Sequence, residues 1–362
     1  MKILIAGFAK IKYMPYINFY LDNIDNDKNE IHVLYWNRDL KQEDIQNYDK
    51  IRLIEFKKRQ DDDVNKIFKI FNFIKYKAFL EKTIDSEKYD FIIILHTFPG
   101  ILMLNKLKKY ANKYIFDYRD STYEKKYFFK KIINKIIKYS KFTFVSSDGF
   151  RKFFQKKYEP KIFTTHNILI ESLIDRNKYK TKIKKEKIRI AYWGIIRNEN
   201  INKEIINKIS HDNRFELHYY GREQQIALNL KEYAKKLNSN NVFFHGEYSP
   251  NDRYEFAKNS DIIHNIFCDD NMNLAMSNKY YDGIIFYLPQ LCMSGSFMAK
   301  QVEKNKIGLS VNPYDNCFTD KIFNYYQNVI SNNFYSFCDI ELQKILDEYN
   351  KNVDIIKDVF NL

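Results

Sequence analysis

Closely spaced cysteines are absent from this sequence of 362 residues, which contains four cysteines in all. They stand at Cys268, Cys292, Cys317 and Cys338, without the short spacings that zinc sites and disulfide frameworks show. Long apolar runs are missing as well: the opening stretch is too short for the apolar core of a signal peptide, and no segment approaches the roughly 20 apolar residues of a membrane-spanning helix. We therefore predict a reduced, cytoplasmic protein, soluble or peripheral on the inner face of the membrane.

A basic charge balance is the main compositional bias. The chain has 60 Lys and Arg against 46 Asp and Glu, a net charge of +14, which suits nucleic acid, anionic lipid or a phosphate-bearing substrate. Heavy use of Lys, Ile, Asn, Tyr and Phe is also what an AT-rich genome encodes, so part of this charge can reflect codon bias. The lysines are scattered and no recognition motif for nucleic acid is present, so we expect no nucleic-acid partner.

Short β-rich runs alternate with longer segments of helical period, the pattern of parallel sheets covered on both faces. The predicted strands are 2–6, 31–36, 51–56, 91–95, 114–117, 142–145 and 161–165, then 188–193, 215–220, 241–245, 261–267, 289–292 and 308–311. A polar, lysine-rich linker over 171–187 separates the two sets. We therefore predict two Rossmann-like α/β domains, 1–175 and 176–340, and a closing helix within 341–362.

Loops that follow strands are where open α/β sheets bind ligands. In the first half, Gly7 follows the first strand, but its loop is no GxGxxG fingerprint and can be a structural turn. His96 follows the fourth strand and can serve as a general base or a sugar contact, or be structural. After the fifth strand, Asp117 and Asp120 flank Arg119; these carboxylates can bind acceptor hydroxyls or act as a base, or Arg119 fixes the loop through an ion pair.

In the second half, Gly194 and Arg197 follow one strand, and Arg222 follows the next strand in the same manner. A guanidinium beside free amides at a helix N-terminus suits a pyrophosphate, although Arg222 can equally be a solvated charge. Lys279 and Asp282 lie three residues apart, on one face at the start of a predicted helix. There a lysine can neutralise phosphate and a carboxylate can take a ribose diol, or the two form an ordinary surface ion pair.

The second-half motifs, taken in order, resemble the donor domain of family-4-like, retaining GT-B glycosyltransferases. The matching positions are Gly194 with Arg197, Gly221 with Arg222, His245 with Gly246, Ser260 with Asp261, Asn278 and Lys279 with Asp282, and Leu288 with Pro289. The resemblance extends from Gly194 to Val311 and covers the first half only weakly. It implies the GT-B fold, two Rossmann-like domains facing each other across a cleft, and a bacterial surface polysaccharide glycosyltransferase.

Carried over to this chain, the resemblance implies that Arg197 and Lys279 hold the donor diphosphate and that Asp282 binds the donor ribose. Gly194 would allow close backbone approach, and His96 is similar to a histidine of the catalytic region in some members. The predicted catalytic residues are therefore His96 and Asp120, and the predicted donor-binding residues are Gly194, Arg197, Arg222, Asn278, Lys279 and Asp282.

Two positions depart from the family pattern. The family has Glu where this chain has the shorter Asp282, and the family's other acid would fall near Leu274, where no acid stands. Asp269 or Asp270 could replace it only through a shifted loop, which leaves the anomeric outcome open. The loop 268–277 is predicted to decide donor identity.

The resemblance implies a UDP- or GDP-sugar donor, a lipid-linked or oligosaccharide acceptor in capsule or O-antigen assembly, and no bound metal or other cofactor. Basic side chains and helix dipoles would offset the charge of the leaving diphosphate. The acidic run 61–63 stands at a predicted helix start and not at a strand end. Two other functions stay open: a non-catalytic glycosyltransferase-like subunit that binds a partner enzyme, and a GT-B UDP-sugar 2-epimerase.

Residues 123–142 interleave Phe and Ile with Lys. Such a basic amphipathic helix can lie on an anionic inner membrane leaflet. It can equally be a packing helix with a solvated lysine face.

Overall fold

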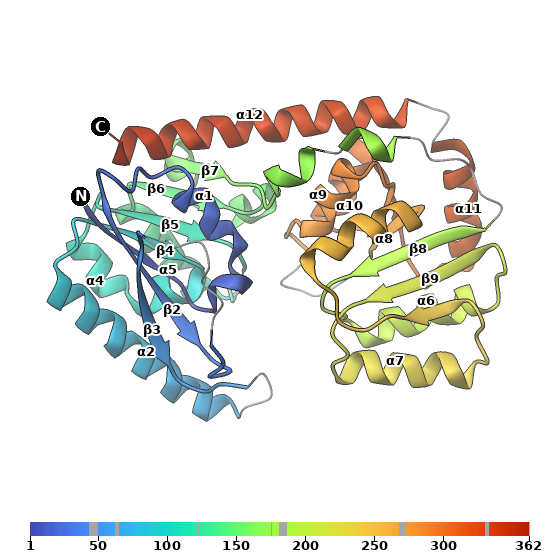
Figure 1. Ribbon diagram of the computed structural model, residues 1–362, viewed down its shortest axis with the longest axis horizontal. Helices are drawn as coiled ribbons and strands as arrows, with labels where there is room; N and C mark the ends of the chain where they lie inside the picture. Colours follow the sequence, from blue (N-terminus) through green and yellow to red (C-terminus); the bar gives the residue numbers. More distant parts are fainter. Residues whose placement is uncertain are drawn as a thin grey trace. The chain divides into compact units, whose positions relative to one another are not determined.

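The computed structural model describes residues 1–42, 50–61, 65–121, 123–174, 176–180, 187–267, 273–329 and 333–361. The chain forms two compact units (Figure 1). The first unit comprises Met1–His166 and Asp347–Leu362, and the second comprises Asn167–Leu346. The sequence predicts the domain boundary at 175/176 and a separate closing helix within 341–362, whereas the two units divide between His166 and Asn167. The last helix, α12 (Phe334–Phe360), begins in the second unit and ends in the first.

The first unit is built on a seven-stranded, all-parallel sheet in the order β3-β2-β1-β4-β5-β6-β7. Its strands are β1 (Lys2–Ala6), β2 (Glu30–Asn37), β3 (Arg52–Lys57), β4 (Phe91–Leu95), β5 (Tyr114–Tyr118), β6 (Phe142–Val145) and β7 (Ile162–Thr164). The central β4 is a continuous apolar run whose five residues are all buried. Such a run forms a strand covered on both faces.

Helices cover both faces of this sheet. They are α1 (Asn18–Leu21), α2 (Lys66–Glu87), α3 (Thr97–Leu102), α4 (Leu104–Lys109), α5 (Tyr127–Tyr139) and the end of α12, with 3-10 helices η1 (Ile11–Tyr13), η2 (Pro15–Ile17), η3 (Asp148–Phe153) and η4 (Lys156–Lys161). On one face, Tyr20 of α1 and Ile356 of α12 belong to the same buried cluster as Ile5 of β1. On the other, Tyr76 of α2 and Ile136 of α5 are fully buried.

The second unit has a six-stranded, all-parallel sheet in the order β10-β9-β8-β11-β12-β13. Its strands are β8 (Ile188–Trp193), β9 (Phe215–Tyr220), β10 (Val242–Phe244), β11 (Ile262–Asn265), β12 (Gln290–Met293) and β13 (Gly308–Val311). Its helices are α6 (Glu199–Ser210), α7 (Gln225–Lys236), α8 (Arg253–Asn259), α9 (Asn278–Ile285), α10 (Phe297–Lys304), α11 (Phe318–Val329) and the start of α12, with η5 (Ile170–Leu173), η6 (Arg176–Tyr179) and η7 (Pro250–Asp252).

Each strand predicted from the sequence overlaps an observed strand, and the predicted architecture of two parallel α/β domains is confirmed. The linker predicted at 171–187 contains parts of η5 and all of η6. Its residues 175 and 181–186 lie outside the described residues. Among the helices that the structure describes, none is both long enough and apolar enough to cross a bilayer.

The turns after β8 and β9 touch through their glycines. The amide of Gly194 donates to the carbonyl of Tyr220 at 2.9 Å, and Gly194 has φ +120°. A Cβ added to Gly221 would lie 2.1 Å from the carbonyl oxygen of Gly194, so only glycine permits this approach. The two turns are thereby held against each other at the carboxyl edge of the sheet.

We predict that Gly221→Ala lowers the free energy of unfolding of the second unit by about 2–3 kcal/mol, because backbone must move to admit the methyl group. The matched control is Gly246→Ala: a Cβ there meets nothing within 4 Å, so only its φ of +80° opposes the change, at a cost of about 1 kcal/mol. Urea unfolding is followed by fluorescence in a Trp36→Phe background, where Trp193 is the only remaining tryptophan. Equal losses in the two variants would contradict the close contact.

Candidate functional site

A chain of buried hydrogen bonds fixes the start of α9 against β11 and β12. Ser277 Oγ donates to Asn265 Oδ1 at 2.9 Å, and Asn265 Nδ2 donates to Gln290 Oε1 at 2.8 Å. Gln290 Nε2 then donates to the carbonyl of Tyr280 at 2.9 Å. Asn265 and Gln290 are fully buried, so the network is shielded from water and the first turn of α9 has a defined position.

Lys279 lies in this fixed first turn and is a buried cation. Its side chain is 9% exposed, and its Nζ lies 4.2 Å from the ring centre of Tyr192. With the residues that the structure describes it forms no hydrogen bond or ion pair. Burial lowers the pKa of Lys279 to about 8, an effect that Asp282 opposes and Arg197 reinforces. A cation in this state is costly unless an anion joins it.

Asp282, one turn later, is buried and has both oxygens engaged. Trp193 Nε1 donates to its Oδ2 at 2.8 Å, and Arg253 Nη1 donates to its Oδ1 at 3.2 Å. Burial raises the pKa of Asp282 although Arg253 and Trp193 act in the opposite direction. The surface ion pair with Lys279 that the spacing also allowed does not form, because α9 is buried and Arg253 pairs with the carboxylate instead.

Trp193 and Arg253 were given no role by sequence reasoning. Trp193 ends β8 directly before Gly194, so its position at a strand end was a usable signal. Arg253 begins α8, and only the packing of α8 beside α9 brings it to Asp282; no local pattern carried that information.

The predicted donor-binding residues are only partly brought together. Arg197 lies close enough to Lys279 to lower its pKa, and the carbonyl of Arg197 accepts a hydrogen bond from Asn202 Nδ2 at 2.6 Å. Arg222 is exposed, and no described residue binds its side chain. Asn278 is also exposed, at the first position of α9. The geometry therefore groups Lys279 and Asp282 near Gly194 and Arg197, and it leaves Arg222 in solvent.

In the first unit, the two predicted catalytic residues form a pair at the carboxyl edge of the sheet. His96 Nε2 lies 3.2 Å from Asp120 Oδ2. His96 has φ +79° and ψ 156°, a backbone conformation that costs a non-glycine residue about 1–3 kcal/mol. Its Nδ1 is buried and has no hydrogen-bond partner in the described chain. Strain together with an unpaired ring nitrogen marks His96 as a candidate functional residue.

Asp117 and Arg119 serve the structure of the same loop. Arg119 Nη2 donates to Asp117 Oδ2 at 2.7 Å, and the hydroxyl of Tyr20 donates to the same oxygen at 2.7 Å. Both charged residues are buried. Gly7 likewise lies in a packed turn, where Tyr76 donates to its carbonyl at 2.6 Å. Arg119 therefore fixes its loop through an ion pair with Asp117, and Gly7 lies in a structural turn.

Several sequence-based predictions fall partly outside the described residues. These are Asp269 and Asp270, residues 268–272 of the loop 268–277, and Asp62 and Asp63 of the acidic run. Asp61 pairs with Arg59 Nε at 3.0 Å. Among the described residues, no three His, Cys, Asp or Glu side chains converge as metal ligands. The expected independence from metal stays a prediction.

The segment 123–142 places its apolar stripe inside the first unit. Ile133, Ile136 and Ile137 of α5 are fully buried. Tyr127 and Phe128, at the start of the helix, are 71% and 68% exposed. Most of this helix therefore packs against the core of the first unit. Only its aromatic start is available for an external contact.

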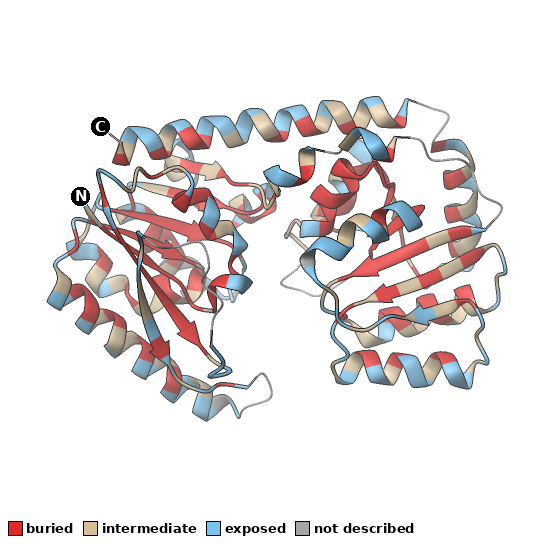
Figure 2. Cartoon of the chain, viewed as in Figure 1, coloured by how far each residue is buried: buried red, intermediate tan, exposed pale blue. Residues whose placement is uncertain are grey.

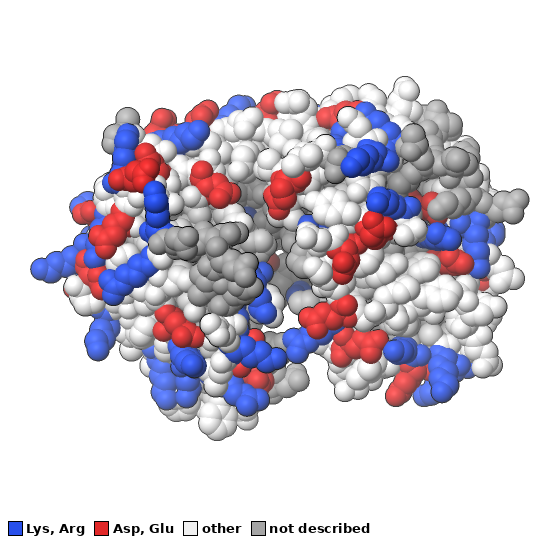
Figure 3. Space-filling model, viewed as in Figure 1, with Lys and Arg blue, Asp and Glu red and all other residues white. Residues whose placement is uncertain are grey.

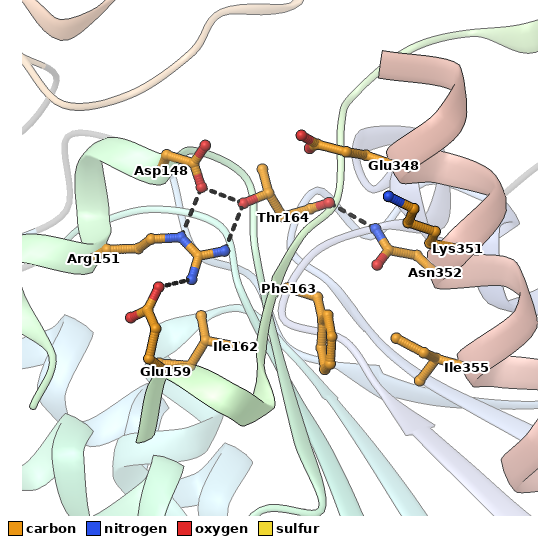
Figure 4. A pocket seen from close by; sticks show the side chains of 10 residues that line it. All are labelled: Asp148, Arg151, Glu159, Ile162, Phe163, Thr164, Glu348, Lys351, Asn352 and Ile355. Atoms are coloured by element: carbon orange, nitrogen blue, oxygen red, sulfur yellow. Dashed lines mark hydrogen bonds and ion pairs between the residues drawn. The ribbon is translucent and has the colours of Figure 1, made fainter. Parts of the chain in front are cut away.

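A separate cavity of about 530 Å³ opens beside β7 and the end of α12 (Figure 4). One wall carries Arg151, whose Nε donates to Asp148 at 2.7 Å and whose Nη2 donates to Thr164 Oγ1 at 3.1 Å. Glu159 also pairs with Arg151, and Asn352 Nδ2 donates to the carbonyl of Thr164 at 2.6 Å. The arginine here is already paired with acidic side chains, unlike Lys279.

On the face of the molecule in Figure 3, basic and acidic side chains are interspersed.

Solved structures of similar fold cover nearly the whole chain. Sucrose-phosphate synthase from Thermosynechococcus elongatus superposes with a TM-score of 0.72 over 99% of both chains at 9% identity. HepE from Anabaena, in complex with UDP and glucose, gives 0.70 over 99% of both chains at 11% identity. UDP-GlcNAc 2-epimerase from Neisseria meningitidis, bound to UDP-GlcNAc, gives 0.59 over 96% of this chain and 100% of that chain at 11% identity.

No protein-family model matches the sequence, and no curated protein matches it at a significant level. At identities this low, the structural likeness shows the fold alone. It confirms the predicted GT-B fold class for both units.

The buried pair of Asp282 and Arg253 can be tested by a double-mutant cycle. We expect Asp282→Asn and Arg253→Gln each to lower the free energy of unfolding of the second unit by about 2 kcal/mol or more, because each leaves a buried polar group without its partner. The double variant should lose about 1–3 kcal/mol less than the sum. Urea unfolding in the Trp36→Phe background measures all four states, and simple additivity would show that the two side chains do not interact.

Proposed function

We propose that this protein is a hexosyltransferase of the GT-B type. It transfers a sugar from a UDP- or GDP-sugar to a lipid-linked or oligosaccharide acceptor during assembly of a cell-surface polysaccharide such as capsule or O-antigen. The HepE structure that holds UDP and glucose supports a nucleotide-sugar donor, and the motif order from Gly194 to Pro289 supports the donor domain.

The observation that carries this proposal is the buried Lys279, whose ammonium forms no hydrogen bond or ion pair with the described residues. A cation that burial penalises, held in a fixed helix turn near the Arg197 guanidinium, is arranged for a ligand with several negative charges. A nucleoside diphosphate supplies those charges. Gly194, which has no side chain, leaves room for the diphosphate beside the backbone at the end of β8.

In the transfer step, the bond between the anomeric carbon and the β-phosphate oxygen breaks, and its electron pair leaves with the nucleoside diphosphate. The acceptor oxygen forms the new bond to the anomeric carbon and gives up its proton. Lys279 and Arg197 offset the charge of the diphosphate, so that no metal or other cofactor is required. The family resemblance favours retention; the departing phosphate oxygen then takes the proton, and His96 with Asp120 holds the acceptor hydroxyl. In inversion, His96 takes the proton.

Asp282 contributes to the ribose site in this proposal. Its Oδ1 already accepts from Arg253 and its Oδ2 from Trp193, so a ribose hydroxyl has to share one of these oxygens. Each carboxylate oxygen can accept more than one hydrogen bond. The protein works in the cytoplasm, at the inner membrane surface, where the aromatic start of α5 and the lysines of 123–142 contact anionic lipid.

Two other functions have support. The epimerase from Neisseria meningitidis shares the fold, so conversion of a UDP-sugar without an acceptor is a second candidate. The missing acid near Leu274 favours the third, a non-catalytic subunit bound to a partner enzyme. Product analysis separates these functions: a transferase or its hydrolytic side reaction releases the nucleotide, whereas an epimerase leaves it attached to the sugar.

The donor site is tested by thermal unfolding with UDP, GDP, CMP and their sugars. One diphosphate nucleotide at about 100 times its Kd should add roughly 2.7 kcal/mol of stability, whether or not EDTA is present. Lys279→Met and Arg197→Ala should lose this gain. Because Lys279→Met also removes a buried charge that no described residue pairs, we expect it to raise the stability of the ligand-free protein by about 1–3 kcal/mol.

The control for the first unit is His96→Gln, which should keep the nucleotide effect and lose turnover of the sugar nucleotide. Lys203→Met is the matched control for Lys279→Met, because Lys203 lies on α6 in an ion pair with Glu199. A folded wild-type protein that no nucleotide stabilises would refute the donor site and favour the partner-binding function.

The affinity for the nucleotide should also depend on pH through Lys279. The protonated amine binds phosphate, and its pKa in the free protein is about 8. The Kd should therefore change little up to about pH 7, be about doubled at pH 8 where half of the amine is deprotonated, and rise by up to about tenfold per pH unit above that. Isothermal titration at pH 7.0, 8.5 and 9.5 measures this rise. Lys279→Met should bind weakly with no such dependence, and a flat wild-type profile would show that Lys279 does not bind the phosphate.

A further inference from the structure

The start of α2 is apolar on the side that faces away from the sheet. Toward the sheet, its first two turns bury the polar Asn72, and the following turns bury Tyr76 and Leu80 completely. Figure 2 colours the exposed residues of α2 pale blue. On the side away from the sheet, large apolar side chains are more than half exposed. These are Ile67 at 61%, Phe68 at 64%, Ile70 at 57%, Phe71 at 57% and Ile74 at 56% exposed, and we refer to them as the outer face of α2. Together they form an apolar patch on the order of several hundred Å², the size that marks interaction surfaces on monomers.

The apolar character of this side ends abruptly along the helix. Beyond Ile74 the same side presents Lys75, Lys82 and Asp85, all exposed. Helix geometry places Lys75 and Lys77 at the two borders of the outer face. A surface helix ordinarily turns polar residues outward along its whole length. The outer face is therefore a local feature of the helix start and needs a covering partner.

A second exposed apolar group lies on the same edge of the same unit. All strands of the sheet are parallel, so α2, which follows β3, and α5, which follows β5, both begin at its carboxyl edge. The short α3 contacts both helices, which places them on one face of the sheet. The start of α5 exposes Tyr127 and Phe128. Two apolar helix starts on one edge suit a broad, flat partner.

The charges around these groups distinguish a bilayer from a second copy of the chain. Lys75 and Lys77 border the outer face, and Lys131 lies 4.4 Å from the ring centre of Tyr127. A symmetric dimer through this surface would bring lysines against lysines. An anionic bilayer attracts them, and it accepts Tyr at its interface and Phe and Ile at greater depth.

We propose that the outer face of α2 inserts into the boundary between headgroups and acyl chains of an anionic bilayer, with Tyr127 and Phe128 as a second contact. The bilayer buries the apolar side chains of the outer face, which are otherwise exposed to water. The bordering lysines contact lipid phosphates. This surface is separate from the donor site in the second unit, so the inference stands or falls independently of the nucleotide. It extends the membrane contact expected from residues 123–142 to a second helix.

Flotation of the full-length protein with vesicles tests this surface. The vesicles consist of phosphatidylcholine alone or with about one third phosphatidylglycerol. We expect binding to the anionic vesicles, weaker binding to the neutral ones, and a loss of at least about tenfold in partitioning for the double variant Phe68→Gln with Phe71→Gln. The matched control is Leu228→Gln, which replaces an exposed apolar residue on α7 of the second unit and should bind like wild type.

Two further measurements keep the outcomes separate. Thermal unfolding with and without nucleotide shows that each variant is folded and retains its donor site. Tyr127→Gln with Phe128→Gln should reduce partitioning by a smaller factor than the α2 variant does. Unchanged vesicle binding of the folded α2 double variant would overturn the proposal. So would light scattering that shows a dimer converted to a monomer by that variant, because the outer face then belongs to a second copy.

Discussion

Parallel pairing of every strand is the constraint from which the candidate sites follow. A parallel sheet forces the chain to return by a crossover after each strand, so each helix that follows a strand begins at the same edge. In the second unit this edge gathers Gly194 after β8, Gly221 after β9 and α9 after β11. In the first it gathers His96 after β4 and Asp120 after β5. The side chains meet because the strands end together, although they are far apart in the sequence.

The strands were predictable because two-sided burial leaves a direct trace in composition. The run Phe91–Leu95 has no polar position, and a segment of that length and composition has few alternatives to a buried strand. Helix spacing correctly placed Lys279 and Asp282 in one helix. It could not show that the helix is buried, because burial depends on Asn265 and Gln290 from two other strands. Likewise, no local pattern announced Arg253 as the partner of Asp282.

Function and stability pull in opposite directions at α9. The network through Gln290 and the pair of Asp282 with Arg253 supply partners to the buried polar groups Asn265, Gln290 and Asp282 beside the helix. Lys279 forms no hydrogen bond or ion pair with the residues that the structure describes, and its pKa is lowered because burial disfavours the charged amine. A rigid, well-satisfied surrounding is what allows one such group to persist, since the fold supplies the stability that the lysine subtracts. His96 shows the same relation in the first unit, where a strained backbone is held by Thr97, whose hydroxyl donates to the carbonyl of Asp120 at 2.6 Å.

The helices α5 and α2 show why amphipathic pattern alone does not locate an external surface. The stripe of Ile133, Ile136 and Ile137 is strongly periodic, and the core of the first unit covers it. In α2 the apolar residues of the first two turns lie on the half that faces away from the sheet, whereas the buried side there carries Asn72 and becomes apolar only from Tyr76 onward. Hydrophobic periodicity indicates that one side of a helix is buried, but it does not show whether the protein core, a partner or a membrane buries it. A helix with a second, external contact is recognised instead by apolar residues on the side that should be polar. That side can be identified only when the side that packs on the sheet is known.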